Sequence, residues 1–276
     1  MTRAVAASVA EWLAAARAAA RQPPAQARQP LWVAGQAVGS VATGVLNQID
    51  LWRLSDKRYQ LLNQEQSDAP VWQLVVAPDA VTPALNLLAQ ALRAQGQCGP
   101  WRDEQLAVCN ARGERLGTIE RGAVRVLGIA TRAVHLVGLA PDGRMWVQQR
   151  SHTKPNNPGM WDTLMGGMVS AADTLPQALE RETWEEAGLR LPALHGVEPG
   201  GQVDFSRPSR EGGGIGYMVE RIDWFRCTVP DGLEPCNQDG EVERFELWSP
   251  AQVRERIAAG DFTLEAALVL GACCGL

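Results

Sequence analysis

The feature that most constrains this chain is a short acidic run that lies between two glycines, Gly167 and Gly188. Three of its glutamates are regularly spaced, because Glu185 and Glu186 lie three and four residues after Glu182. On a helix these spacings place all three carboxylates on one face. Pro176 near the start and Gly188 after the end are typical of the two ends of a helix, so we predict a helix over 176–187.

Three carboxylates on one helical face repel one another, and a divalent cation turns that repulsion into a binding site. Mg²⁺ prefers hard oxygen ligands and keeps several waters, so two or three carboxylates and a substrate phosphate suit it. A bound cation can neutralise phosphate charge and activate a water nucleophile. The alternative is an ordinary solvated face, because Arg181 and Glu185 alone are an unremarkable i, i+4 pair.

The whole pattern resembles the Nudix box. Gly167 lies six residues before Asp173, which lies eight before Arg181, and the run Arg181-Glu-Thr-Trp-Glu-Glu-Ala-Gly-Leu189 closes it. The resemblance implies an α/β/α sandwich with a mixed sheet and metal-dependent hydrolysis of a small-molecule diphosphate. It makes Mg²⁺ the expected cofactor and Mn²⁺ the alternative. The residues that it implies for the metal and the chemistry are Arg181, Glu182, Glu185 and Glu186, with Glu182 either a ligand or the general base.

This sequence departs from the Nudix box at two positions. Asp173 stands where the family usually has Glu, so its reach is one methylene shorter, and Thr183 replaces an aliphatic residue. Neither change removes a principal metal ligand. They leave open whether Asp173 joins the metal network.

Residues on either side of the box complete the predicted site. The family often supplies one more acid from the region that here reads Asp-Gly-Glu-Val-Glu, and we expect Glu241 rather than Glu243 to be that ligand. The alternative is a polar turn before a strand. Upstream, Arg150 and Lys154 can hold phosphate oxygens, unless they belong to a solvated basic loop. The predicted substrate-binding residues are Arg150, Lys154, Trp161, Gly166 and Gly167.

A narrower resemblance extends to most of the chain after about residue 30. Arg150–Pro155, Pro158–Asp162 and Ile222-Asp-Trp224 are similar to the Nudix domains associated with thiamine pyrophosphokinase. Those proteins carry an extra N-terminal region, which here would include 31–41 and 101–122. The resemblance implies hydrolysis of thiamine diphosphate, or of its oxidised analogues, to a monophosphate and phosphate. Such a ring needs an aromatic or apolar pocket, for which Trp161 and Trp101 are available unless they only pack in the core.

Other functions stay open at this point. A nucleoside or nucleotide-sugar diphosphate would suit the same metal helix, because one scaffold hosts many substrates. A non-catalytic binding module on this scaffold is a further alternative, which the intact Glu182, Glu185 and Glu186 disfavour. Isopentenyl diphosphate isomerase shares the fold but needs an upstream cysteine, and none lies between Cys109 and Cys227.

Composition narrows the class of protein. The net charge of −5 and the lack of a dense basic run argue against a nucleic-acid partner. No run approaches the ~18 apolar residues of a membrane span, and the N-terminus reads as no signal peptide. Six cysteines without a C-x-x-C pair and only three histidines disfavour zinc and suit the reducing cytoplasm. A homodimer is left open.

The pattern of elements predicts an α/β chain in two parts. A smaller α+β domain of unassigned function would span residues 1–122, and the Nudix domain would span 123–276. The first part should hold a helix over 4–21, a linker over 22–30 and two hairpins, over 31–41 and 105–120. In the second part we expect a strand over 124–139, a mobile glycine-rich connection over 200–216 and a strand over 217–229 that breaks near 222–223.

Overall fold

The larger sheet is organised around strand β7 (Ala130–Leu139), most of whose residues are buried on both faces. The computed structural model describes residues 2–49, 59–66 and 69–276. Within these ranges the sheet has seven strands in the order β11-β12-β7-β8-β13, while β10 pairs with β7 and β9 with β8. The other strands are β8 (Met145–Arg150), β9 (Trp161–Asp162), β10 (Met165–Met168), β11 (His195–Ser209), β12 (Gly216–Thr228) and β13 (Val242–Trp248).

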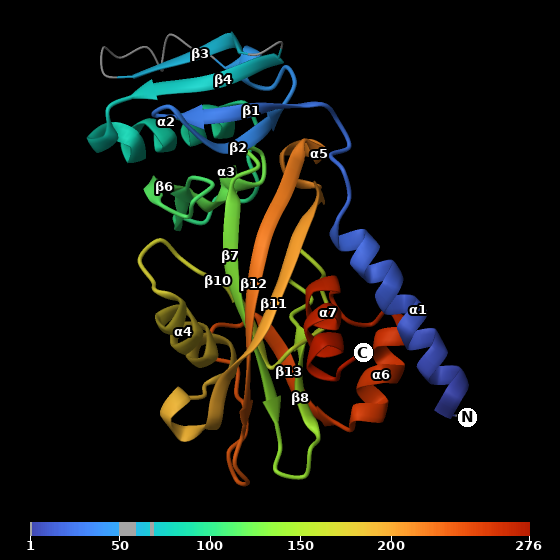
Figure 1. The fold of residues 1–276 in the computed structure, drawn as a ribbon. Coiled ribbons are helices and arrows are strands. Elements are labelled where there is room, and N and C mark those ends of the chain that lie inside the picture. The colour runs from blue at the N-terminus through green and yellow to red at the C-terminus, as the bar shows by residue number, and fades with distance from the viewer. Residues whose placement is uncertain (1, 50–58, 67–68) are drawn as a thin grey trace.

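Helices cover both faces of this sheet (Figure 1). Helix α4 (Leu175–Ala187) lies on one side, and α6 (Pro250–Ala259) and α7 (Leu264–Cys273) lie on the other. Strand β12 runs parallel to β7, whereas β8 and β10 run antiparallel to it, so the sheet is mixed. The predicted α/β/α architecture is therefore confirmed. No helix in the described ranges is long and apolar enough to cross a membrane.

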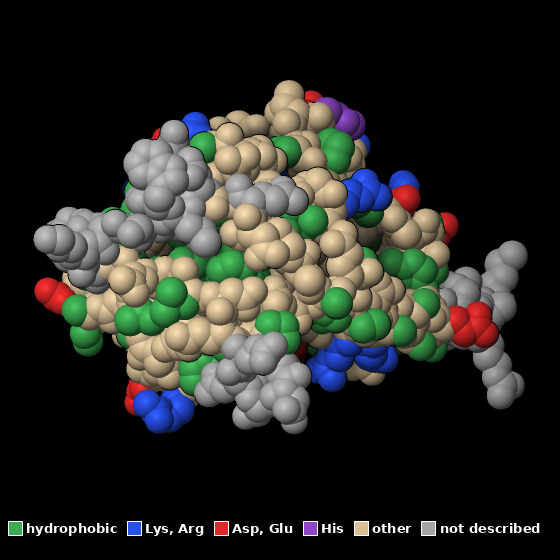
Figure 2. All heavy atoms as spheres, turned by 90° about the horizontal axis from the view of Figure 1, so that it is seen from above, with side chains coloured by type: hydrophobic (Ala, Val, Ile, Leu, Met, Phe, Trp, Pro, Cys, Tyr) green, Lys and Arg blue, Asp and Glu red, His purple; other side chains and the backbone are tan. Residues whose placement is uncertain are grey.

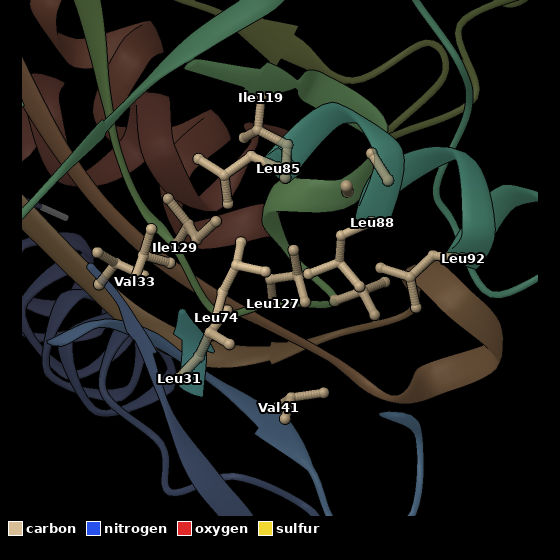
Figure 3. Packing of buried hydrophobic residues seen from close by; sticks show 14 of the residues in the cluster. Leu31, Val33, Val41, Leu74, Leu85, Leu88, Leu92, Ile119, Leu127 and Ile129 are labelled. Atoms are coloured by element: carbon tan, nitrogen blue, oxygen red, sulfur yellow. The ribbon is translucent and has the colours of Figure 1, made fainter. Parts of the chain in front are cut away.

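A smaller α+β unit precedes this sandwich. Its sheet has the order β2-β1-β4-β3, and α2 lies beneath it. Leu31, Leu74, Leu85 and Leu88 are fully buried between sheet and helix (Figure 3). Seen from above, the outer face shows hydrophobic side chains among uncharged groups (Figure 2). The unit comprises β1 (Arg28–Val33), β2 (Gln36–Ala42), β3 (Tyr59–Gln66), β4 (Ala69–Val76), α2 (Val81–Ala94), β5 (Gln105–Cys109), β6 (Arg115–Glu120) and α3 (Arg121–Val124).

The first helix, α1 (Thr2–Ala20), packs away from this unit. Its buried residues Val9, Leu13 and Ala16 share a hydrophobic cluster with residues of α6 and α7. The predicted helix therefore exists, but its buried face packs on the C-terminal sandwich (Figure 1). For the chain that follows the linker, we still propose a domain boundary near residue 122. Helix α1, which precedes the linker, belongs to the C-terminal part.

Three expectations about strands are wrong. Residues 200–209 belong to the long strand β11, although a glycine-rich mobile connection was expected over 200–216. Gly200 serves packing there, because a Cβ on it would lie 1.9 Å from the Trp224 ring. Strand β12 runs unbroken through Asp223, whose carboxylate is satisfied by Arg132 at 2.7 Å and Gln202 at 2.8 Å. Strand β7 begins only at Ala130, since the chain before it forms α3 and a turn.

The two parts are joined around the hairpin β11–β12. The backbone N–H of Tyr217 donates to Arg125 O at 2.7 Å, and Arg28 Nη1 donates to Ile215 O at 2.6 Å. On the other side, the loop before α4 is attached to β5, since Ala171 N–H donates to Gln105 O at 2.7 Å. These contacts place the N-terminal unit beside the acidic helix.

Candidate active site

Helix α4 holds the acidic face, and its ends are defined by local sequence. At its start the backbone N–H of Thr174 donates to Gln177 Oε1 at 2.9 Å, and at its end Gly188 adopts a left-handed φ of 63°. The side chain of Thr183 is fully buried, and its hydroxyl donates to Leu179 O at 2.6 Å. Threonine is therefore tolerated at this position because its polar group is satisfied within the helix.

Arg181 connects the acidic side chains of the box. Its Nη1 donates to Glu182 at 2.8 Å and to Glu185 at 2.9 Å. Its Nε donates to Asp173 at 2.9 Å, so the shorter acid still reaches the arginine. The guanidinium fork thereby fixes the positions of three carboxylates that would otherwise repel one another.

Glu186 lies deepest, with a side chain that is 3% exposed. One oxygen accepts from Gln148 Nε2 at 2.8 Å and from the backbone N–H of Gly166 at 3.0 Å. The other lies 3.4 Å from Lys154 Nζ. Burial raises the pKa of Glu186, and Lys154 and these two donors oppose that shift.

The glycine pair Gly166-Gly167 is required by close approach. A Cβ on Gly166 would lie 2.7 Å from the His135 ring, and one on Gly167 would lie 2.0 Å from the Glu182 carboxyl carbon. The absence of a side chain at Gly166 leaves room for His135 of β7, and its absence at Gly167 leaves room for the Glu182 carboxylate of the acidic helix. The predicted role of the pair in the site is consistent with this geometry, although its contact with substrate stays a prediction.

Glu182 differs chemically from a surface glutamate. Burial raises its pKa to about 7, with Arg181 opposing that shift and Glu186 adding to it. A carboxyl group in this range can accept and release a proton near neutral pH. The property suits a general base, which is one of the two roles that the sequence left open.

The donors suit a hard divalent cation. Glu182, Glu185 and Glu186 supply carboxylate oxygens from one helix, and Glu241 supplies another from the loop before β13. In the structure Arg181 and Lys154 hold these oxygens, and Lys154 pairs with both Glu186 and Glu241. Among the described residues no three acidic, histidine or cysteine groups already converge as a complete ligand set. These oxygen donors fit Mg²⁺. Binding of the cation would require Lys154 to move away from Glu186 and Glu241.

All these groups line one cavity of about 1030 Å³ between α4, the β11–β12 hairpin and the N-terminal unit. Arg150 and Lys154 lie in its wall, as the sequence predicted, and Arg150 contacts Asp162 at 3.3 Å. Glu241 also lines the cavity, whereas Glu243 does not and is exposed. The structure thus brings together nine of the ten predicted residues: Arg150, Lys154, Gly166, Gly167, Arg181, Glu182, Glu185, Glu186 and Glu241.

Trp161 is the exception, and its predicted contact with substrate is not supported. Its side chain is 6% exposed and packs on Trp248, with ring centroids 4.3 Å apart. The ring belongs to the core beneath the sheet, where burial of a large aromatic surface is most favourable. Trp101 is also absent from the cavity wall and stacks under Arg93 instead.

Sequence reasoning missed several residues in the wall. His135 is buried on β7 and lies 2.9 Å from Thr163 Oγ1. Arg102, Arg121 and Arg125 come from the N-terminal unit, and the tip of β11–β12 adds Glu211. Arg102 and Arg121 lie in the segment 101–122, which the narrower resemblance assigned to the extra N-terminal region without a role in the site. The others lie in no motif, because tertiary contacts bring them to the site.

Comparison with known proteins identifies the family of the domain that holds the acidic helix. A model of the NUDIX domain matches residues 130–268. "Nudix hydrolase 20, chloroplastic" of Arabidopsis thaliana is 31% identical over 150 residues, which cover 52% of this chain and 38% of that protein. A "Nudix hydrolase" of Deinococcus radiodurans is 32% identical over 161 residues, which cover 58% of this chain and 86% of that protein.

A yeast relative, "Uncharacterized protein YJR142W", is 27% identical and is covered over 53% of its length. This chain thus spans from about two fifths to one half of the first curated relatives that it matches. The crystal structure of DR0079 from Deinococcus radiodurans aligns over 62% of this chain and 99% of that one, with a TM-score of 0.48 and 25% identity. From the domain match over half of its length and the acidic helix that lies inside it, the chain belongs to the Nudix family.

Proposed function

We propose that this protein hydrolyses an organic diphosphate with the help of a divalent cation, Mg²⁺ or Mn²⁺. The observation that carries the proposal is the acidic face of α4, which Arg181 and Gly166 fix against a large cavity. A structural helix gains little from burying like charges, whereas a metal-dependent hydrolase needs them.

The residues divide the work by their surroundings. A divalent cation, when bound, would supply positive charge to the diphosphate and activate water. Glu186 is held by three donors and would give a fixed ligand, while Glu185, at 43% exposed, can turn toward the cavity. Glu182, which lies in the cavity wall and is held by Arg181 at 2.8 Å, would accept the proton from the attacking water. Arg150, at the end of β8, would hold phosphate oxygens from its place in the cavity wall.

For the substrate we propose a thiamine-type diphosphate, cut to a monophosphate and phosphate. Support comes from the similarity of 150–155 and 158–162 to thiamine pyrophosphokinase-associated Nudix domains. The cavity limits how the ring would be held, since no Phe, Tyr or Trp is among the described residues of its wall. Met168, Met218 and Pro208 offer apolar surface in place of stacking. A nucleoside or nucleotide-sugar diphosphate is the second candidate.

The deciding experiment separates the products of hydrolysis by chromatography and quantifies the monophosphate formed with Mg²⁺ and, separately, Mn²⁺. Equal concentrations of thiamine diphosphate, its oxo analogue, a nucleotide sugar and a nucleoside triphosphate would be compared by kcat/KM. We expect the highest value on a thiamine compound and none after chelation of the metal. A higher value on either nucleotide would replace the thiamine proposal and keep the hydrolase. No turnover of any diphosphate would favour a binding module.

Two further properties are proposals. The six cysteines are free thiols, which suits the reducing cytoplasm. A homodimer is an open hypothesis that sedimentation velocity would test.

A further inference from the structure

The N-terminal unit forms the wall of the cavity that faces the acidic helix. Arg102 comes from the loop before β5, and Arg121 and Arg125 come from α3 and the residue after it. None of these residues lies within the matched domain of residues 130–268. The unit therefore contributes side chains to a cavity whose acidic wall lies in the matched domain.

Backbone contacts hold these arginines in place. Gly99 N–H donates to Gly122 O at 2.8 Å, which ties the two arginine-bearing loops together. The backbone N–H of Arg102 donates to Glu120 Oε1 at 2.8 Å, and that carboxylate belongs to a residue only 1% exposed. A buried acid that accepts from backbone groups is a positioning device, because its loss would leave those donors unsatisfied.

The same loops are fixed to the acidic side of the cavity. Arg115 Nη1 and Gln105 O both bond to the backbone of Ala171, in the loop that leads into α4, at 2.7 Å each. On the other flank Tyr217 N–H donates to Arg125 O at 2.7 Å. The arginine wall and the acidic helix are thus held at a set separation, as a preorganised site requires.

The three arginines differ in how far their charge is neutralised. Arg125 pairs with Glu220 at 2.8 Å, and Arg121 pairs with Glu104 at 2.7 Å. Arg102 makes no ion pair within 4 Å to any acid in the described ranges. Arg102 and Arg121 line the same cavity as Glu182, Glu185 and Glu186, so their charges lie on the path of an anion that binds there.

We propose that Arg102 and Arg121 form an anion subsite that binds the phosphate of the substrate farther from α4. The subsite rests on the proposed function, because it takes the second phosphate of the diphosphate whose first phosphate the acidic helix and its cation hold. Guanidinium groups bind phosphate oxygens in a bidentate manner, and Arg102 is free to do so. A diphosphate would then bridge the two walls, with opposite kinds of partner at its two ends.

The test is binding of methylenediphosphonate, a diphosphate analogue that cannot be hydrolysed, measured by titration calorimetry with Mg²⁺. We expect Arg102→Ala and Arg121→Ala each to weaken binding about tenfold or more. Arg112→Ala is the matched control, because Arg112 lies in the β5–β6 turn with a 73% exposed side chain and should bind as wild type does. Glu104→Gln breaks the same ion pair as Arg121→Ala but keeps the cation, so its affinity should be unchanged or higher.

The outcomes separate the subsite from the hydrolase activity. Wild-type affinity in both arginine variants would overturn the subsite, and turnover by the wild type would still support the hydrolase. Arginine-dependent binding without turnover of any diphosphate would support the subsite and overturn the hydrolysis. Equal losses in Arg121→Ala and Glu104→Gln would show that only the ion pair matters and would remove Arg121 from the subsite. No binding by the wild type would overturn the subsite itself.

Discussion

The two walls of the cavity were built in opposite ways. The acidic wall comes from one helix, where Glu182, Glu185 and Glu186 are neighbours in sequence. The arginine wall joins segments that the hairpins of the N-terminal unit bring together, such as Arg102 and Arg121. The glutamates of the acidic wall therefore have a helical spacing in the sequence, whereas the residues of the arginine wall have no regular spacing.

The difference shows which functional residues lie close together in the sequence and which are brought together only by the fold. Metal-type chemistry needs several acids within a few ångströms, and one helical turn supplies them. The arginine wall would select and orient the anion that binds. The residues for this role can come from any helix, strand or loop that reaches the cavity. We therefore expect changes on the acidic wall to affect turnover, and changes on the arginine wall to affect affinity or stability.

The largest effect should come from Glu185→Gln. Because this charge is needed mainly in the transition state, we expect kcat to fall on the order of 10²–10³-fold at saturating Mg²⁺. The fold should persist, since Glu185 is 43% exposed and its pair with Arg181 contributes at most about 1 kcal/mol. Steady-state kinetics and thermal unfolding measure the two quantities.

Glu180→Gln is the control for that variant, because Glu180 is exposed on the same helix and lies outside the cavity wall. It should leave kcat unchanged. Near wild-type turnover in Glu185→Gln would remove Glu185 from the metal site and weaken the contrast between the walls.

A smaller effect should follow from Gly167→Ala. The new methyl group would meet the Glu182 carboxyl carbon at 2.0 Å, so this flexible side chain must move. We expect kcat to fall about tenfold, as misplacement of a catalytic group does, with little change in the free energy of unfolding.

A double-mutant cycle with Glu182→Asp identifies the cause. If the methyl group acts through Glu182, it should cost much less in the Glu182→Asp background, where the side chain is shorter. Strictly additive losses in kcat would point to a backbone shift in β10 instead.

The smallest effect concerns Glu211, which lies on the arginine side against Gly99. Burial raises its pKa, Arg125 and Arg121 oppose that shift, and Glu220 adds to it. A carboxyl whose folded-state pKa is raised favours the folded state below its unfolded pKa, and that stability is lost as pH rises through the folded value. Glu211→Gln should therefore raise Tm by a few degrees at most at pH 7 and less at pH 4.

Thermal unfolding across this pH range tests the idea, with Glu243→Gln as an exposed control. A lower Tm at pH 7 in Glu211→Gln would mean that its attraction to Arg125 and Arg121 outweighs its burial. The arginine wall would then be held by that acid.

Several errors in the predicted fold share one cause. Gly200 predicts a flexible connection, yet it lies in β11 and leaves room for the Trp224 ring to pack against that strand. Asp223 predicts a break, yet Arg132 and Gln202 satisfy its carboxylate inside β12. Trp161 predicts an available ring, yet Trp248 covers it. In each case the partner lies far away in sequence, so local propensity favours the wrong answer.

The sequence by itself determined the acidic helix with its terminal Gly188 and the family, and nine of the ten site residues that it proposed line one cavity. These depend on spacings within about one turn or on adjacent segments, and helix geometry converts such spacings directly into positions. Only the tertiary structure decided that α1 packs on the C-terminal sandwich and that Arg102, Arg121 and Glu211 enter the cavity. Those placements follow from which surfaces are buried together, and burial depends on the whole chain rather than on any short pattern.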